Sequence, residues 1–393
     1  MTQQEHLPHH FSERQQEHLP HHSSERQPEH LPQHSSERQL EHSIESSTGH
    51  KSQPELESMP NKPPLNLIRG ILTAYAVGDA MGMPTEFMTR AEISSQLGFV
   101  DRLLEPSQSK NHPNLPKASI TDDTEQVCAL LEEYSKEDSI DPYITARRLL
   151  RWMKESNAIE KGYIGPSSRM ALEAIERGES PEKAGKKGTT CGGVMRSPAA
   201  VLFAAARQRP LADCIRACLI PTHNNQLAME PAMAYGYALH AAICGKDIEE
   251  ILREAEKGAE VAQTVPDSKG CPQCEASVMA RLLHFEMLAS SFSDTDEVLD
   301  FIYYVYGTTL ASVDVAAAAM CIFLFAMDDV WLSIKMGTSV GGDTDTIAAL
   351  AGALSSAYAL SHGQSLNIPE AIVSEVLKKN KLDFDRLAER LYL

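Results

Sequence analysis

The stretch Val340-Gly341-Gly342-Asp343-Thr344-Asp345-Thr346 precedes the clearest helical pattern in the chain. Apolar residues recur at helical spacing from Ile347 to Tyr358, which predicts a helix over 347–361. Acidic and hydroxyl residues before a helix often cap its free N–H groups, and this is one interpretation. Capping needs one side chain, however, and here Asp343, Asp345 and Thr346 crowd behind two glycines. The alternative is a site for a hard cation such as Mg²⁺, which prefers several oxygen ligands on a bendable backbone.

A similar cluster, Thr121-Asp122-Asp123-Thr124, lies far upstream and also precedes a helical pattern, with Val127, Leu130, Leu131 and Tyr134 on one face. Asp122 with Glu125, or Asp123 with Gln126, would make ordinary capping boxes. Two clusters of this kind, each at the junction of a loop and a helix, instead suggest one shared site that holds one or two metal ions.

The order and spacing of these motifs resemble the ADP-ribosylglycohydrolase family. The resemblance rests on TDDT at 121–124 and GGDTDT at 341–346, and it extends from about Leu65 to about Leu360. Three further segments fit, namely GDAMGMPTE at 78–86, GGVMRSP at 192–198 and Thr222-His223.

The resemblance implies an enzyme that hydrolyses the N- or O-glycosidic bond at C1″ of ADP-ribose on a modified protein side chain. It implies two Mg²⁺ ions, with Mn²⁺ as a substitute, held by Thr121, Asp122, Asp123, Asp343, Asp345 and Thr346. Asp123 or Asp345 would also accept a proton from water, and the residues alone do not choose between them. Glu86 would lie on a mobile loop over the metals, so the expected catalytic residues are Glu86, Asp123 and Asp345.

The glycine-rich loop over 188–193 meets a helix expected to begin near Met195. Such a junction is an anion site by geometry, although an ordinary turn is the simpler interpretation. The resemblance implies that Cys191, Gly192 and Gly193 contact the substrate, but many family members carry Asn where this chain has Cys191. It also places His223 beside ADP-ribose, whereas the pattern alone allows a helix cap or a core histidine.

Asp79 continues the helical spacing of Leu65, Ile68, Leu72 and Tyr75, which puts a carboxylate on an apolar face. Such a group is costly to bury unless it is paired. Asp79 is therefore either a support for the metal ligands or a structural hydrogen-bond acceptor. The flanking Gly78 and Gly82 would let another backbone approach. We expect Arg196 to pack or to form an ion pair rather than to bind substrate.

Helical periodicity covers most of the chain after Leu65, and strand signals are almost absent. Further helices are expected over 141–153, 166–177, 194–206, 211–219, 225–243, 247–262, 275–290, 294–306, 312–328, 369–379 and 383–391. Alanine-rich runs over 315–320 and 348–359 would allow close helix contacts. We therefore expect one all-α domain of compactly packed, orthogonal helices over 61–393, following an N-terminal tail.

The tail, residues 1–60, contains three copies of a 12-residue unit over 5–40 and ten of the fifteen histidines. Its apolar content is too low to compensate for the entropy of ordering, so we expect it to be disordered and dispensable. Nothing fixes a ligand geometry there, so any metal binding would be adventitious.

The formal net charge of −18 argues against an extended nucleic-acid surface. A polar N-terminus and the lack of a long apolar run predict no signal peptide and no membrane span, and thus a cytoplasmic protein. Eight cysteines without a framework pattern fit a reducing compartment, and Cys271 and Cys274 form an isolated CxxC pair. We expect a monomer.

Residues 65–393 hold 44 acids and 31 bases, an excess that slightly favours a cationic ADP-ribosyl-arginine substrate, with ADP-ribosyl-serine as the runner-up and another ADP-ribosyl linkage as a further alternative. Two other classes of function are considered. A non-catalytic ADP-ribose-binding module would not need the complete set of metal-ligand residues, so the presence of this set disfavours that class. A structural protein has no use for these residues and is the least favoured class.

Overall fold

The computed structural model describes residues 62–263 and 277–393. Within these ranges the chain forms seventeen α-helices and no β-strand, and the pairing of Thr190 with Ala311 is an isolated bridge. The all-α prediction is confirmed. The predicted tail over 1–60 and the Cys271–Cys274 pair lie outside the described residues.

The α-helices are α1 (Leu65–Gly82), α2 (Arg90–Gln96), α3 (Asp122–Tyr134), α4 (Pro142–Glu155), α5 (Pro166–Glu176), α6 (Pro181–Ala184), α7 (Ser197–Arg207), α8 (Leu211–Leu219), α9 (Gln226–Ile243), α10 (Ile248–Gln263), α11 (Val278–Leu288), α12 (Thr295–Phe301), α13 (Ser312–Ala326), α14 (Val330–Ser339), α15 (Thr344–Ser361), α16 (Glu370–Asn380) and α17 (Phe384–Arg390). Four 3₁₀ turns, η1 (Met83–Thr85), η2 (Pro106–Gln108), η3 (Gly185–Lys187) and η4 (Ala289–Ser291), and the π-helical η5 (Ile302–Tyr306) complete the elements.

The periodic pattern located most of these helices but missed α2, α6 and α14. All three are short, and the buried side of α2 and α14 is not an apolar stripe. In α2 it is Arg90 and Ile93, and in α14 it includes Ser333, Gly337 and Thr338. Helical periodicity of apolar residues cannot detect a helix whose buried face is polar or small.

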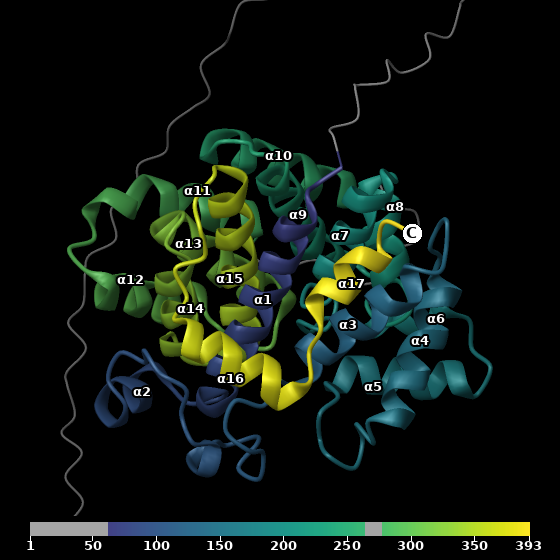
Figure 1. Ribbon diagram of the computed structural model, residues 1–393, viewed down its shortest axis with the longest axis horizontal. Coiled ribbons are helices and arrows are strands. Elements are labelled where there is room, and N and C mark those ends of the chain that lie inside the picture. Colours follow the sequence, from purple (N-terminus) through teal and green to yellow (C-terminus); the bar gives the residue numbers. More distant parts are fainter. Residues whose placement is uncertain (1–61, 264–276) are drawn as a thin grey trace, which may run out of the picture. The chain divides into compact units, whose positions relative to one another are not determined.

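Helices α1 and α15 lie against each other at the middle of the described fold (Figure 1). A Cβ atom on Gly78 would lie 2.3 Å from the carbonyl oxygen of Ala348, and one on Gly82 would lie 2.4 Å from that of Thr344. Only glycine allows two helix backbones to approach so closely. The predicted close backbone approach at Gly78 and Gly82 is confirmed, and it joins the end of α1 to the start of α15.

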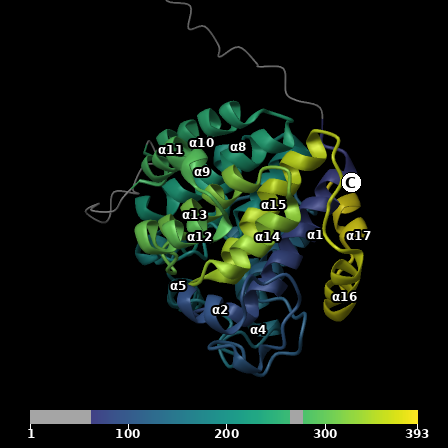
Figure 2. The ribbon, with the colours of Figure 1, turned by 90° about the vertical axis from the view of Figure 1, so that its left-hand side faces the viewer.

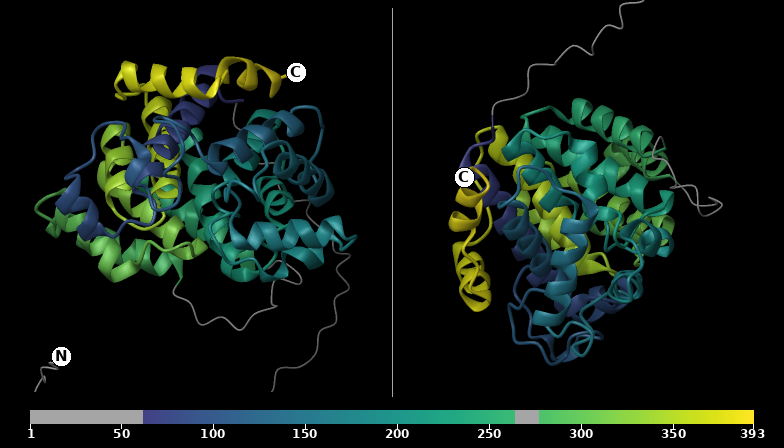
Figure 3. Two further views of the ribbon diagram at one scale, coloured as in Figure 1. Left: turned by 90° about the horizontal axis from the view of Figure 1, so that it is seen from below. Right: turned by 90° about the vertical axis from the view of Figure 1, so that its right-hand side faces the viewer.

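The other helices surround this pair. Alanine-rich α13 packs on α15 and α9, and the C-terminal α16 and α17 lie along the outer side of α1 (Figures 2 and 3). None of the helices in the described ranges is long and apolar enough to cross a membrane. The buried faces of α1, α3 and α15 thus form the frame on which the two Asp/Thr clusters are held.

Candidate active site

Asp79, in the last turn of α1, holds the beginning of α3 in place. Its carboxylate accepts hydrogen bonds from the backbone N–H groups of Thr121 (3.0 Å) and Thr124 (3.1 Å) and from their hydroxyls (2.8 and 2.5 Å). Burial raises the pKa of Asp79 to about 6, although these hydrogen bonds favour the ionised form. Thr121 is therefore bonded to Asp79, and it is not among the residues that line the cavity described below.

The first turn of α3 presents Asp122 and Asp123. One oxygen of Asp123 lies 3.2 Å from the Tyr75 hydroxyl, and the other accepts a hydrogen bond from Thr346 Oγ1 at 3.3 Å. Asp122 Oδ2 accepts from Gln126 Nε2 at 2.8 Å. The capping boxes considered above do not form, because the N-cap of α3 is Thr121, whose side chain accepts from the Asp123 N–H.

The second cluster follows a sharp turn that only glycine can make. Gly341 and Gly342 have φ angles of +88° and +80°, which L-residues with side chains rarely adopt. A Cβ atom on Gly342 would lie 2.0 Å from the carbonyl oxygen of Thr308. The turn brings Asp343 to the N-cap position of α15 and Asp345 into its first turn.

Asp343 does not act as a cap, although it occupies the N-cap position. Its side chain makes no capping hydrogen bond, and its Oδ2 atom is buried without a hydrogen-bond partner among the described residues. Burying an unpaired charged oxygen is costly, so such an atom calls for a partner that the protein itself does not supply. For Asp343 the capping interpretation is therefore wrong.

Glu86 approaches the second cluster from the segment that follows η1. Oxygens of Glu86, Asp343 and Asp345 all lie within 4.8 Å of one another. The amide nitrogen of Asn111 donates to both Glu86 oxygens, at 3.0 and 2.9 Å. The next residue, Phe87, has a φ of +61° and donates its N–H to the carbonyl oxygen of Gly342 at 2.7 Å. This unusual backbone conformation ties the Glu86 segment to the glycine turn.

The carboxylates of the site raise one another's pKa values. Burial is the main cause for Asp122, Asp123 and Asp345, whose pKa values rise well above the usual range, and neighbouring negative charges add to it. The pKa of Asp343 rises to about 6 for the same reasons, with Glu86 as the main neighbouring charge. A bound divalent cation would offset this repulsion.

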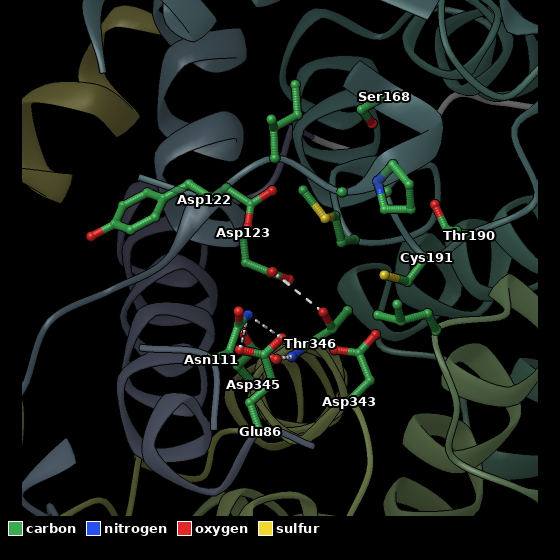
Figure 4. A pocket seen from close by; sticks show the side chains of 18 of the residues that line it. Glu86, Asn111, Asp122, Asp123, Ser168, Thr190, Cys191, Asp343, Asp345 and Thr346 are labelled. Atoms are coloured by element: carbon green, nitrogen blue, oxygen red, sulfur yellow. Dashed lines mark hydrogen bonds between the residues drawn. The ribbon is translucent and has the colours of Figure 1, made fainter. Parts of the chain in front are cut away.

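These side chains open into one cavity of about 230 Å³ (Figure 4). Glu86, Asn111 and Asp345 lie together on one side, while Cys191, Thr190 and Ser168 lie across from them. Among the described residues that line it there is no lysine, arginine or histidine. An acidic cavity with an unpaired buried oxygen fits a divalent cation held by carboxylates.

The glycine loop forms a thin wall of this cavity. Cys191 and Gly192 line it, and a Cβ atom on Gly192 would lie 2.9 Å from both His223 Cε1 and Ser168 Oγ. His223 is fully buried behind the loop and does not line the cavity. Nor does it cap a helix, because Asn225 is the N-cap of α9.

The structure thus brings together most of the residues expected from sequence. Those lining the cavity are Glu86, Asp122, Asp123, Cys191, Gly192, Asp343, Asp345 and Thr346. Gly193 packs against the His223 side chain, with 3.2 Å from its would-be Cβ to His223 Cβ. Arg196 is fully buried and forms no ion pair among the described residues. It donates to Gln126 and Thr222 instead.

Sequence reasoning missed several polar residues of the site. Asn111 lies in a proline-containing loop without a periodic signal, and Ser168 lies in the first turn of the helix predicted over 166–177, where a serine is not unusual. Nothing in the sequence marked either residue. Tyr75 had a signal: it lies one helical turn before Asp79 on the same face. Its hydroxyl donates to the carbonyl oxygen of Met195 at 2.6 Å, linking α1 to the glycine loop.

The sequence profile described as ADP-ribosylglycohydrolase matches residues 60–393. The chain belongs to the ADP-ribosylglycohydrolase family. The uncharacterized protein YegU of Escherichia coli K12 is 31% identical over 327 residues, which are 82% of this chain and 96% of that protein. The ADP-ribosylarginine hydrolase Tri1 of Serratia proteamaculans is 23% identical over 85% of this chain and 81% of its own length.

A solved structure titled as an ADP-ribosylglycohydrolase-related protein complex shares the fold, with a TM-score of 0.57 at 22% identity over 84% of this chain and 97% of that chain. The family resemblance read from the two Asp motifs is confirmed. As a member of the ADP-ribosylglycohydrolase family, this chain is a hydrolase of glycosidic bonds that acts on ADP-ribosylated substrates. The family is generally metal-dependent, and the buried acidic cluster agrees with that property.

Proposed function

We propose that the protein removes ADP-ribose from modified arginine side chains in a Mg²⁺-dependent reaction that cleaves the bond at C1″. One observation carries the metal part of the proposal. Asp343 Oδ2 is buried and unpaired, an oxygen of Asp343 lies within 4.8 Å of carboxylate oxygens of Glu86 and Asp345, and no basic side chain of the described residues lines the cavity. Hard oxygen ligands of this kind suit Mg²⁺, with Mn²⁺ as a substitute.

The proposed metal ligands are Asp122, Asp123, Asp343, Asp345 and Thr346, with Thr121 in support. Two divalent cations held here would bind the ribose hydroxyls, orient the sugar and lower the pKa of a water molecule. Asp123 or Asp345 then accepts the proton of the attacking water. Asp79 fixes the backbone of the first turn of α3, so that Asp122 and Asp123 keep their positions when substrate binds.

Glu86 has a separate role in this proposal. Its carboxylate accepts from Asn111 and lies 3.3 Å from His112 Nε2, while the backbone of the next residue is tied to the glycine turn. The side chain of Glu86 can therefore leave the cluster without movement of its backbone, of α3 or of α15. The carboxylate of Glu86 covers the metal site until substrate displaces it and then faces the scissile bond. This role predicts that Glu86→Ala slows turnover while Mg²⁺ still binds.

Arginine is the favoured acceptor because its guanidinium is a cation while it is attached to ADP-ribose. The acidic lining of the cavity and its lack of basic residues among those described favour a cationic leaving group electrostatically. The relative Tri1 carries the name of an ADP-ribosylarginine hydrolase, which supports the same choice. Serine is the runner-up acceptor, and a non-catalytic ADP-ribose-binding module is the alternative.

Turnover of Glu86→Ala in the presence of Mg²⁺ tests this proposal, with Glu105→Ala as the matched control. Glu105 is an exposed glutamate ahead of η2 and does not line the cavity. We expect about a 100-fold slower release of ADP-ribose for Glu86→Ala, an unchanged thermal shift with Mg²⁺, and wild-type behaviour for Glu105→Ala. Full activity of Glu86→Ala would remove Glu86 from the mechanism, and loss of its Mg²⁺ response would make it a metal ligand instead.

A further inference from the structure

A line of buried polar side chains runs behind the glycine loop, from the metal-ligand side of the cavity to the opposite wall. Asp122 accepts from Gln126 at 2.8 Å, and Gln126 Oε1 accepts from Arg196 Nη1 at 3.4 Å. Arg196 Nη2 donates to Thr222 Oγ1. Thr222 Oγ1 lies 2.7 Å from His223 Nδ1, and His223 Nε2 lies 3.2 Å from Thr190 Oγ1. The line ends at Thr190, whose side chain lines the cavity (Figure 4).

Arg196 decides which way these hydrogen bonds point. A guanidinium can only donate, so Thr222 Oγ1 must accept from Arg196. The hydroxyl hydrogen of Thr222 then has one acceptor within hydrogen-bonding distance among the described residues, His223 Nδ1. The reverse arrangement would leave the buried Thr222 hydrogen without a partner, at a cost of about 1–3 kcal/mol.

His223 is therefore the tautomer that carries its hydrogen on Nε2. Burial and the charge of Arg196 hold the pKa of His223 well below its usual range, so the ring is neutral and has a single N–H. Since Nδ1 accepts from Thr222, the Nε2–H donates to Thr190 Oγ1. Thr190 is thus an acceptor in this bond.

The consequence for Thr190 is that its own hydroxyl hydrogen is directed away from His223. No acceptor for it lies within hydrogen-bonding distance among the described residues. The backbone around Thr190 is fixed independently: Ser312 Oγ donates to the Thr190 carbonyl oxygen at 2.6 Å, and Cys191 N–H donates to the Leu310 carbonyl oxygen at 2.8 Å. The loop thus holds an oriented hydrogen-bond donor at the cavity wall that faces the carboxylates.

We propose that Thr190 is a substrate-positioning residue that donates its hydroxyl hydrogen to an oxygen of bound ADP-ribose, and that His223 sets the direction of this donor. The inference rests on the proposed function, because it takes ADP-ribose as the ligand. It gives His223 an indirect role, consistent with its complete burial behind Gly192 and Gly193. The carboxylates of Glu86, Asp343 and Asp345 on the facing side are acceptors when ionised, so a donor on the opposite wall suits an oxygen of the ligand.

The test measures ADP-ribose affinity by calorimetry with full-length, Mg²⁺-loaded protein. Thr190→Val removes the donor at constant shape and should weaken binding about 10-fold, the loss of one hydrogen bond to a charged oxygen. Thr190→Ser keeps the hydroxyl and should bind within about 2-fold of the wild type. Thr73→Val, a buried threonine in α1 whose hydroxyl bonds the Arg69 carbonyl oxygen away from the cavity, is the matched control and should bind like the wild type.

A double-mutant cycle tests the role of His223. His223→Leu should weaken binding less than Thr190→Val does, because Thr190 keeps its hydroxyl and loses only its fixed direction. In the Thr190→Val background, His223→Leu should weaken binding no further, since no donor is left to orient. Additive losses would overturn the role of His223.

Equal affinity of Thr190→Val and wild type would overturn the inference as a whole, even if His223→Leu does not fold. A wild-type protein that hydrolyses nothing but binds ADP-ribose would refute the catalytic proposal and leave this inference standing, whereas a wild type that does not bind ADP-ribose would overturn both.

Discussion

The Asp79 carboxylate and Thr121 are joined by two hydrogen bonds to the same oxygen, one from the Thr121 N–H at 3.0 Å and one from its hydroxyl at 2.8 Å. Thr124 makes the equivalent pair to the other oxygen. A side chain at the end of α1 thereby replaces the missing partners of the first turn of α3. The geometry of Asp122 and Asp123 depends on a residue 42 or more positions earlier in the chain.

We therefore predict that Asp79→Ala lowers the free energy of unfolding by about 3 kcal/mol, since buried N–H and hydroxyl donors lose a charged acceptor. Mg²⁺ binding should weaken as well. Asp141→Ala is the control. Asp141 caps α4 at the surface by accepting from the Ile144 N–H at 2.7 Å, and its loss should cost about 1 kcal/mol. Chemical denaturation with and without Mg²⁺ measures both, and an unchanged Mg²⁺ response of Asp79→Ala would contradict the supporting role.

Asp343→Asn should stabilise the metal-free protein and remove its response to Mg²⁺. The substitution removes one of several buried charges that repel one another, a gain of roughly 2 kcal/mol. Wild-type protein should gain about 3 kcal/mol from Mg²⁺ at 100 times its dissociation constant, and the variant should gain almost nothing. Asp101→Asn, at an exposed position, is the control. A variant that keeps the wild-type melting shift with Mg²⁺ would exclude Asp343 as a ligand.

The pH dependence of the Mg²⁺ effect follows from the raised pKa values. Asp79 and Asp343 have pKa values of about 6 in the fold, against about 4 in an unfolded chain. Between these values the metal-free fold binds more protons than the unfolded chain, so its stability should fall as the pH rises through this window. Mg²⁺ competes with those protons, so its melting shift should be larger at pH 8 than at pH 5. An equal or larger shift at pH 5 would contradict a carboxylate site.

Gly342→Ala should destabilise the protein far more than Gly98→Ala. Both positions have a left-handed backbone, at φ +80° and +70°, which costs an alanine about 1 kcal/mol. Only at Gly342 would the added Cβ also meet backbone, 2.0 Å from the Thr308 carbonyl oxygen, whereas nothing lies within 4 Å at Gly98. We expect a total loss of about 3 kcal/mol or more at Gly342. Equal melting temperatures of the two variants would show that the turn at Gly342 can shift to accommodate a Cβ atom.

Sequence reasoning succeeded where a local pattern carries the information. The stripe that ends at Asp79 revealed a buried carboxylate, and the two Asp/Thr clusters revealed the acidic side of the cavity. Gly78 and Gly82 of α1 predicted a close backbone contact, which the α15 helix makes. In each case the residue type is unusual at its position in the expected helix or turn. This can be seen in the sequence without knowledge of the fold.

The rest depends on contacts between distant segments. Asn111 approaches Glu86 only because the loop after α2 returns to the site, and no pattern within that loop marks the amide. Whether His223 lines the cavity or lies behind its wall depends on how closely Gly192 packs against it. The spacing of residues in the sequence carries no information on this packing. The direction of the Thr190 hydroxyl depends on Arg196 through two further side chains.

The most direct test of the central claim is the release of ADP-ribose from matched peptides that carry the modification on arginine or on serine, with Mg²⁺ or with an excess of chelator. We predict rapid release from the arginine-linked peptide with Mg²⁺, slower release from the serine-linked peptide, and none from either with chelator. Asp345→Ala should release nothing under any condition, because it removes a carboxylate that lies within 4.8 Å of Glu86 and Asp343. Full activity in chelator would contradict the metal site, and release from serine alone would contradict the choice of acceptor.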